Sequence, residues 1–249
     1  MRSTRAAATR PLVALLLAAP PLAHAGPPFL TGDPDTVDAR HWEISVGARS
    51  ERRSGQRLDA LPAFEVNYGI AEGLEASVES AWVRLRENGV SSQRGWENVV
   101  VGLKWRILEQ EKDGVGFAVK PEFGFANASS ARKGLADENN TILVDFRVQK
   151  AIGEMQMGAA AAPTFESGGG SNAWQYGAYV KRDFEHHTIG IELNGSRESE
   201  GASRLVLNFG AQIHLVEWGK LLLGIGRELR NTEEPKLTSR AYVGLQLAF

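Results

Sequence analysis

The chain ends with the segment 239–249, SRAYVGLQLAF, in which apolar and polar residues alternate. One face of this segment carries Ala241, Val243, Leu245, Leu247 and Phe249, and the other carries Arg240, Tyr242, Gly244 and Gln246. A period of two is that of a β-strand whose two faces meet different surroundings. The segment therefore predicts a strand with one apolar face and one polar face.

Eleven earlier segments repeat this alternation, and no window shows a clear helical period. They are residues 41–50, 62–70, 74–85, 96–108, 114–126, 140–151, 155–166, 173–183, 188–197, 203–215 and 220–229. With 239–249 the count is twelve. The links broadly alternate in length, from a long polar link at 51–61 to a short one at 71–73, and from a long one at 86–95 to a short turn near 109–113. The longest link is 127–139 and a short one follows at 152–154.

Short turns at one end and long loops at the other are typical of up-and-down barrels in the outer membrane. We therefore expect an all-β fold, an antiparallel transmembrane β-barrel of about twelve strands over residues 41–249. An even strand number places both termini on the periplasmic side. The terminal Phe249 resembles the signal by which bacterial outer-membrane barrels are recognised for insertion.

Six tryptophans give an independent test, because all lie at or near the ends of the predicted strands. They are Trp42, Trp82, Trp96, Trp105, Trp174 and Trp218. Membrane barrels carry aromatic girdles at both membrane–water interfaces, whereas a soluble sandwich would bury some of its tryptophans in mid-strand. The tryptophan positions favour the membrane barrel.

The first 25 residues have the features of a secretory signal peptide. Arg2, Arg5 and Arg10 precede a short apolar stretch, and Ala23-His24-Ala25 is a small-x-small cleavage site. Export with cleavage after Ala25 predicts an outer-membrane location. The full chain has 28 basic and 30 acidic residues, a net charge of −2 and no cysteine. That balance argues against nucleic-acid binding, and the lack of cysteine excludes disulfides and thiol chemistry.

The polar face of the strands predicts a charged lumen of nearly balanced sign. Basic and acidic residues two apart, at 120/122, 145/147 and 181/183, are expected to pair with each other, since an unpaired buried charge is costly. A strongly ion-selective pore would show rings of one sign instead. The candidate lumen-lining residues are Lys104, Arg106, Lys120, Glu122, Asp145, Arg147, Lys181, Asp183, Glu192 and Arg240.

Two stretches carry a family resemblance. Residues 26–34, GPPFLTGDP, followed by His41-Trp42-Glu43, look like the mature N-terminus of one group of bacterial outer-membrane proteins. Residues 101–107, VGLKWRI, with Lys120-Pro121-Glu122, resemble the central strand pair of that group. The family is labelled by the MetA pathway of phenol degradation and is similar to transporter-like barrels. The resemblance implies a barrel that passes small or aromatic compounds, and it transfers no catalytic residues.

Several alternatives remain beside a narrow channel for passive passage of small solutes. One is a closed structural barrel with a charge-packed lumen; others are an outer-membrane lipid-modifying enzyme and a soluble periplasmic β-sandwich. We expect no enzyme, because the four mature histidines lie toward the periplasmic side and no G-x-S-x-G motif is present. We also expect no cofactor and no metal. The expected partners are outer-membrane lipid, lipopolysaccharide and the assembly machinery, around a monomer.

The Pro- and Asp-rich leader, residues 26–40, is expected on the periplasmic side and is too rich in proline for a strand; we call it the lead-in. Two interpretations are open. It folds into the barrel mouth as a partial plug anchored by His41-Trp42-Glu43, or it is a disordered tail.

Overall fold

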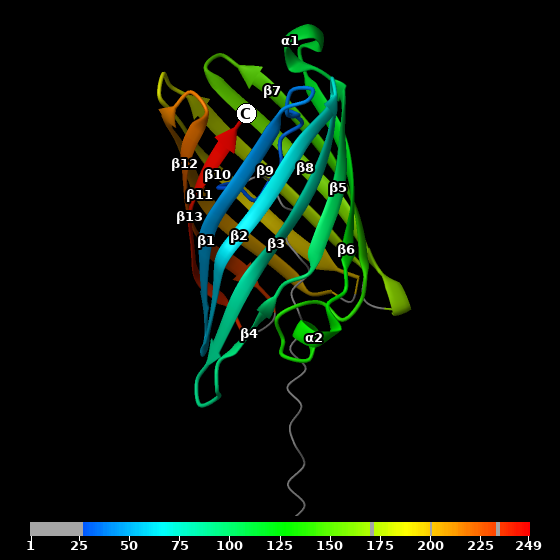
Figure 1. The fold of residues 1–249 in the computed structure, drawn as a ribbon, viewed down its shortest axis with the longest axis vertical. Coiled ribbons are helices and arrows are strands. Elements are labelled where there is room, and N and C mark those ends of the chain that lie inside the picture. The colour runs from blue at the N-terminus through cyan, green and yellow to red at the C-terminus, as the bar shows by residue number, and fades with distance from the viewer. Residues whose placement is uncertain (1–26, 170–171, 200, 233–234) are drawn as a thin grey trace, which may run out of the picture.

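The structure is a computed structural model that describes residues 27–169, 172–199, 201–232 and 235–249. The predicted signal peptide, with its cleavage site after Ala25, lies outside these residues. The described chain forms one closed antiparallel barrel (Figure 1). No helix in the described part is long and apolar enough to cross a membrane.

Thirteen strand segments make up twelve positions in the wall. Both β4 and β5 pair with β3, so that together they form one interrupted wall strand. The barrel closes because β1 pairs with both β13 and β2, and the prediction of twelve strands is confirmed. The bounds are β1 (Trp42–Arg53), β2 (Gln56–Ala71), β3 (Leu74–Glu87), β4 (Gln93–Trp96), β5 (Val99–Leu108), β6 (Gly116–Phe125), β7 (Thr141–Ile152), β8 (Met155–Glu166), β9 (Ala173–Asp183), β10 (His187–Glu198), β11 (Ser203–Val216), β12 (Gly219–Asn231) and β13 (Leu237–Ala248).

The two ends of the barrel differ. We call the end with the β2–β3 and β7–β8 turns, the start of β1 and the end of β13 the turn end, and the opposite end the loop end. The helix α1 (Gln110–Asp113) lies at the turn end, whereas β4 and the helix α2 (Ala128–Ala131) lie at the loop end (Figure 1). The backbone of Trp42 exchanges two hydrogen bonds with that of Phe249, at 2.7 and 3.0 Å, which joins the first and last strands at the turn end.

The predicted link lengths are wrong at two places. The β1–β2 connection is a tight turn at residues 54–55, where Gly55 has a φ of +74°, and β3 continues to Glu87. Residues 51–61 are charged on both faces, so the hydrophobic alternation disappears while the strands still pair. The short turn near 109–113 and the long link 127–139 each contain a one-turn helix, α1 and α2, too short to produce a helical period.

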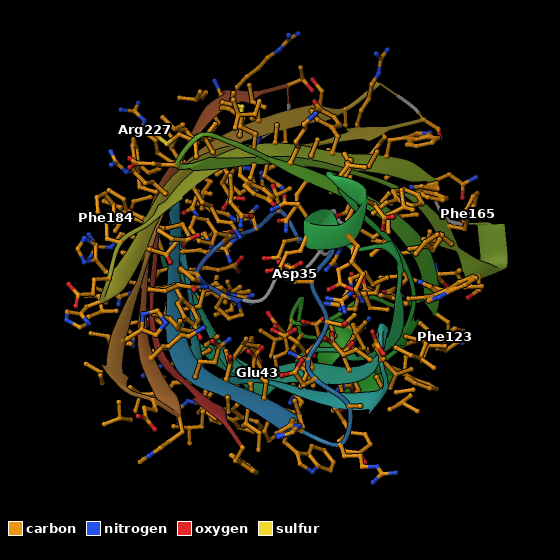
Figure 2. The ribbon with its side chains drawn as sticks, turned by 90° about the horizontal axis from the view of Figure 1, so that it is seen from above. Asp35, Glu43, Phe123, Phe165, Phe184 and Arg227 are labelled. Atoms are coloured by element: carbon orange, nitrogen blue, oxygen red, sulfur yellow. The ribbon has the colours of Figure 1, made fainter. Side chains whose placement is uncertain are left out.

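Side chains point inward and outward in the alternation that the sequence predicts. Outward residues such as Val243, Leu245 and Phe146 are exposed, and inward residues such as Gln246 and Asp145 are buried. Figure 2 shows Glu43 inside the ring of strands, and Phe123, Phe165, Phe184 and Arg227 outside it. An apolar outer surface of this extent needs an apolar environment.

Candidate functional site

The lumen is lined by charged side chains that are shielded from solvent. Six of the ten predicted lumen residues are nearly fully buried: Lys104, Lys120, Glu122, Asp145, Arg147 and Glu192. Arg106, Lys181 and Arg240 are partly buried, and Asp183 is exposed at the end of β9. The interior is therefore a polar network rather than an apolar core.

Two of the three ion pairs expected from the sequence form, and one does not. Lys120 Nζ lies 2.6 Å from Glu122 Oε1, and Arg147 Nε lies 2.7 Å from Asp145 Oδ2. Lys181 instead pairs with Asp33 of the lead-in, at 3.0 Å. Asp183 accepts a hydrogen bond from Thr188 Oγ1, at 2.5 Å. The prediction of a Lys181–Asp183 pair is wrong, because Asp33 of the lead-in supplies the carboxylate that Lys181 binds instead.

Another ion network lies toward the loop end. Arg240 Nη1 lies 3.9 Å from Glu51 Oε1. Arg53 Nη2 lies 3.3 Å from the other oxygen of the same carboxylate, Glu51 Oε2. Arg204 Nε lies 2.5 Å from Glu228 Oε1. Both halves of the lumen thus hold paired charges of both signs, which disfavours strong ion selectivity.

The lead-in lies inside the barrel. It enters at the turn end, where Arg40 N donates to Gly69 O, at 2.6 Å, and Ala39 forms a parallel bridge with Gly69. Farther in, Val37 N donates to Glu75 Oε2, at 2.9 Å. Figure 2 shows Asp35 within the ring of strands. Of the two interpretations of this segment, the structure has the one in which it fills part of the lumen. Its buried side-chain anchors are residues of the barrel wall and not residues 41–43, as the sequence suggested.

Glu192 of β10 holds the innermost part of the lead-in. Its carboxylate accepts hydrogen bonds from the backbone N–H groups of Leu30 and Thr31, at 2.6 and 2.7 Å, and from Asn208 Nδ2, at 2.7 Å. Asn208 Nδ2 also donates to Pro28 O, at 3.2 Å. Hydrogen bonds to an ionised carboxylate are the strong ones, at about 1.5–3 kcal/mol each. Glu192 is therefore the main anchor of the segment.

Two carboxylates of the lead-in have opposite pKa shifts. Burial opposes the ionisation of Asp33, but the positive charge of Lys181 outweighs it, together with Lys104 and Arg147, and holds the pKa of Asp33 well below its usual range. Burial, followed by the negative charge of Asp33, raises the pKa of Asp35. Asp35 accepts from Gln149 Nε2, at 2.9 Å. Asp33 is thus held as an anion that pairs with Lys181, whereas Asp35 is ionised less readily and binds the wall through its hydrogen bond with Gln149.

Inward-facing glycines make room for the lead-in. A Cβ on Gly177 would lie 2.1 Å from Thr31 Oγ1, and one on Gly210 would lie 2.6 Å from the Phe29 ring. Similar contacts below 3 Å follow at Gly190 and Gly116. Side chains at these positions would occupy the space that the segment fills. The sequence did not single out this cradle, although the inward phase of these glycines was a usable signal.

The loop between β6 and β7 narrows the loop end from inside. Leu135 is buried against an apolar inner surface made by Ala60, Ala81, Val83 and Leu85. Asp137 tethers the loop, since its Oδ2 accepts from Asn98 Nδ2 at 3.0 Å. Burial of a leucine contributes about 1.5–3 kcal/mol toward holding this loop inward.

The six predicted girdle tryptophans all lie on the outside, and each is exposed by at least 38%. Trp42, Trp105 and Trp218 belong to the turn end, and Trp82, Trp96 and Trp174 to the loop end. Phe249 also points outward and is 60% exposed. Its role as an insertion signal stays a prediction.

Four histidines of the described chain, His41, His186, His187 and His214, are exposed at the turn end. Within the described ranges, no group of three His, Asp or Glu residues could hold a metal ion.

No protein-family model and no curated protein matches the sequence. The fold is similar to that of an outer-membrane channel from Pseudomonas putida F1, with a TM-score of 0.68 and 12% identity, over 88% of this chain and 98% of that one. It is also similar to the KdgM porin, with a TM-score of 0.56 and 18% identity, over 82% and 99% of the two chains. For the NanC porin the TM-score is 0.56 and the identity 12%, over 81% and 98%. The chain therefore has the fold of outer-membrane barrels.

Proposed function

We propose that this protein is an outer-membrane channel for the passive passage of small solutes, gated by its own lead-in. The closed barrel with an apolar exterior and a polar lumen supports the location and the pathway. The signal peptide, with cleavage after Ala25, and insertion by the outer-membrane assembly machinery belong to the same proposal. We expect a monomer, since the barrel closes on itself.

The observation that carries the gate is how the lead-in is held. It joins the wall through side chains such as Glu192, Lys181 and Gln149, and through one isolated bridge at Ala39, rather than through a strand ladder. Such contacts break one at a time, each at about 1–3 kcal/mol. The segment can therefore leave the lumen while the barrel stays closed by its strands.

The solutes that we propose are small and of the aromatic or hydrophobic class. The apolar inner wall at the loop end, which includes Val83 and Leu85, is covered by Leu135 and does not by itself select this class. The family resemblance to phenol-degradation proteins implies the same class. The KdgM porin has been solved with oligogalacturonate, an acidic oligosaccharide. The paired charges of the present lumen speak against a strong preference for such anions.

Conductance in planar bilayers tests the proposal. Channel openings are expected, and replacing Lys104 and Glu122 by glutamine should change their conductance if these residues line the path. Swelling of proteoliposomes should be faster with phenol-sized solutes than with acidic sugars. The second candidate is a closed structural barrel, which the lead-in and Leu135 favour because both occupy the lumen. A complete lack of openings and swelling would support the closed barrel.

A further inference from the structure

Five arginines gather on the outer face of the barrel at the loop end, on β1 to β4. Arg52 lies directly opposite Arg57, which lies opposite Arg86, across three neighbouring strands. Arg84 lies opposite Arg94 in the next row. Their strand neighbours Val83 and Gly95 face the lumen, so these side chains point outward. We call the set the arginine patch.

The arginine patch is short of negative partners. Asp59 Oδ1 lies 2.8 Å from Arg57 Nε, and Asp59 Oδ2 lies 3.4 Å from Arg86 Nη2. Among the described residues, this is the one carboxylate paired with the patch, so five positive charges and one negative charge leave a net charge of +4. Like charges directly opposite across antiparallel strands destabilise the sheet. The patch is therefore suited to an anionic ligand.

The patch also has a defined height on the barrel. Trp82 and Trp96 lie opposite each other on the outer face, with ring centroids 5.4 Å apart, and Phe64 lies 6.2 Å from Trp96. Arg84 and Arg94 are two residues farther toward the loop end, or about 7 Å along the strand. Aromatic girdles mark the edge of the hydrocarbon, so the guanidinium groups lie at the level of the lipid head groups.

We propose that the arginine patch binds the phosphate groups of a phosphorylated outer-leaflet lipid of the lipid A class. Guanidinium groups bind phosphate in a bidentate manner, and the aromatic residues below offer apolar contact for acyl chains. Four adjacent strands span about 14 Å, which is wider than one phosphate and fits a head group with two. This inference rests on the proposed outer-membrane location, with the loop end facing the outer leaflet.

The test measures lipid binding to the full chain in neutral detergent by native mass spectrometry. The probes are bisphosphorylated lipid A, the same lipid without phosphates, phosphatidylglycerol and inorganic phosphate. In the test variant, Arg52, Arg84 and Arg94 become glutamine, which leaves both ion pairs of Asp59 in place. In the control variant, three exposed basic residues elsewhere on the outer surface, Lys150, Arg197 and Arg227, become glutamine.

The test variant should bind bisphosphorylated lipid A at least about 100-fold more weakly, since it loses three charge-assisted phosphate contacts. The control variant should keep its affinity within about threefold, and the dephosphorylated lipid should bind all variants equally weakly. Equal binding of the two forms of lipid A, an equal loss in the control variant, or equally tight binding of phosphatidylglycerol or inorganic phosphate would overturn the proposal. On denaturing gels, each folded variant should migrate faster when unheated than after heating, which verifies that its barrel is intact. Conductance should not differ between the variants. Because lipid binding is measured without any channel activity, the lipid site can be tested even if the barrel proves to be closed.

Discussion

Replacing Glu192 by alanine should release the lead-in from the lumen. The Glu192 carboxylate accepts two backbone N–H groups of the lead-in, from Leu30 and Thr31, at 2.6 and 2.7 Å. The alanine variant loses both bonds and leaves two buried donors unpaired. At about 1.5–3 kcal/mol per bond, the lost docking free energy is about 3–6 kcal/mol. The lower value corresponds to about a 100-fold change in the population of the released segment.

The chain has no cysteine, which gives a direct assay. Thr31 is 4% exposed, so a Thr31→Cys variant should react slowly with a water-soluble maleimide while the lead-in is docked. Adding Glu192→Ala should raise the labelling rate about 100-fold and increase the open time in bilayers. Other contacts, such as Lys181 with Asp33, remain and set the residual docking.

The matched control is Glu51→Ala. Glu51 pairs with Arg49, Arg53 and Arg240, which all belong to the barrel wall. This variant should leave the labelling of Cys at position 31 unchanged within a few-fold. If Glu192→Ala also leaves labelling and open time unchanged, Glu192 does not anchor the lead-in and the reasoning is refuted.

Two further predictions concern the cradle and the inward loop. Gly210→Ala places a Cβ 2.6 Å from Phe29 and should weaken docking by about 1–3 kcal/mol, measured by the same labelling, whereas Gly124→Ala crowds a side chain of the wall and should not. The pKa of Asp137 is raised from 3.8 to about 6, first by burial and then by nearby carboxylates. The neutral form therefore stabilises the folded loop below pH 4, and this stabilisation is lost as the pH rises to about 6. Hydrogen exchange of residues 127–140, corrected for its intrinsic rate, should be at least about tenfold slower at pH 4.5 than at pH 7.5, and Asp137→Asn should remove the difference. An unchanged pH dependence in that variant would exclude Asp137 as the cause.

The barrel was predictable because lipid and lumen impose opposite demands on alternate residues. In the last strand, Val243 and Leu245 face outward, and Gly244 and Gln246, which alternate with them, face the lumen. The pair Lys120–Glu122 was predictable for the same reason, since residues two apart share a face. The tight turn at Gly55 was not, because charged residues occupy both faces of the strands beyond the apolar band.

The lead-in was predictable in composition but not in position. It follows no period, and its contacts with Glu192 and Lys181 join residues more than 140 positions apart. Asp33 of the lead-in binds Lys181, and for this reason the expected pair between Lys181 and Asp183 does not form. The clearest available signal was a set of inward-phase glycines, including Gly177 and Gly210, on a face otherwise filled by large polar side chains.

A disulfide between the lead-in and the wall tests the central claim most directly. A Cβ on Gly177 would lie 3.0 Å from Thr31 Cβ, so a shift of roughly half an ångström brings Thr31→Cys and Gly177→Cys into the range for a disulfide. In planar bilayers, the oxidised barrel should show no openings, and reduction should restore them in the same membrane. Equal conductance in the oxidised and reduced states, or no openings in either, would contradict gating by the lead-in.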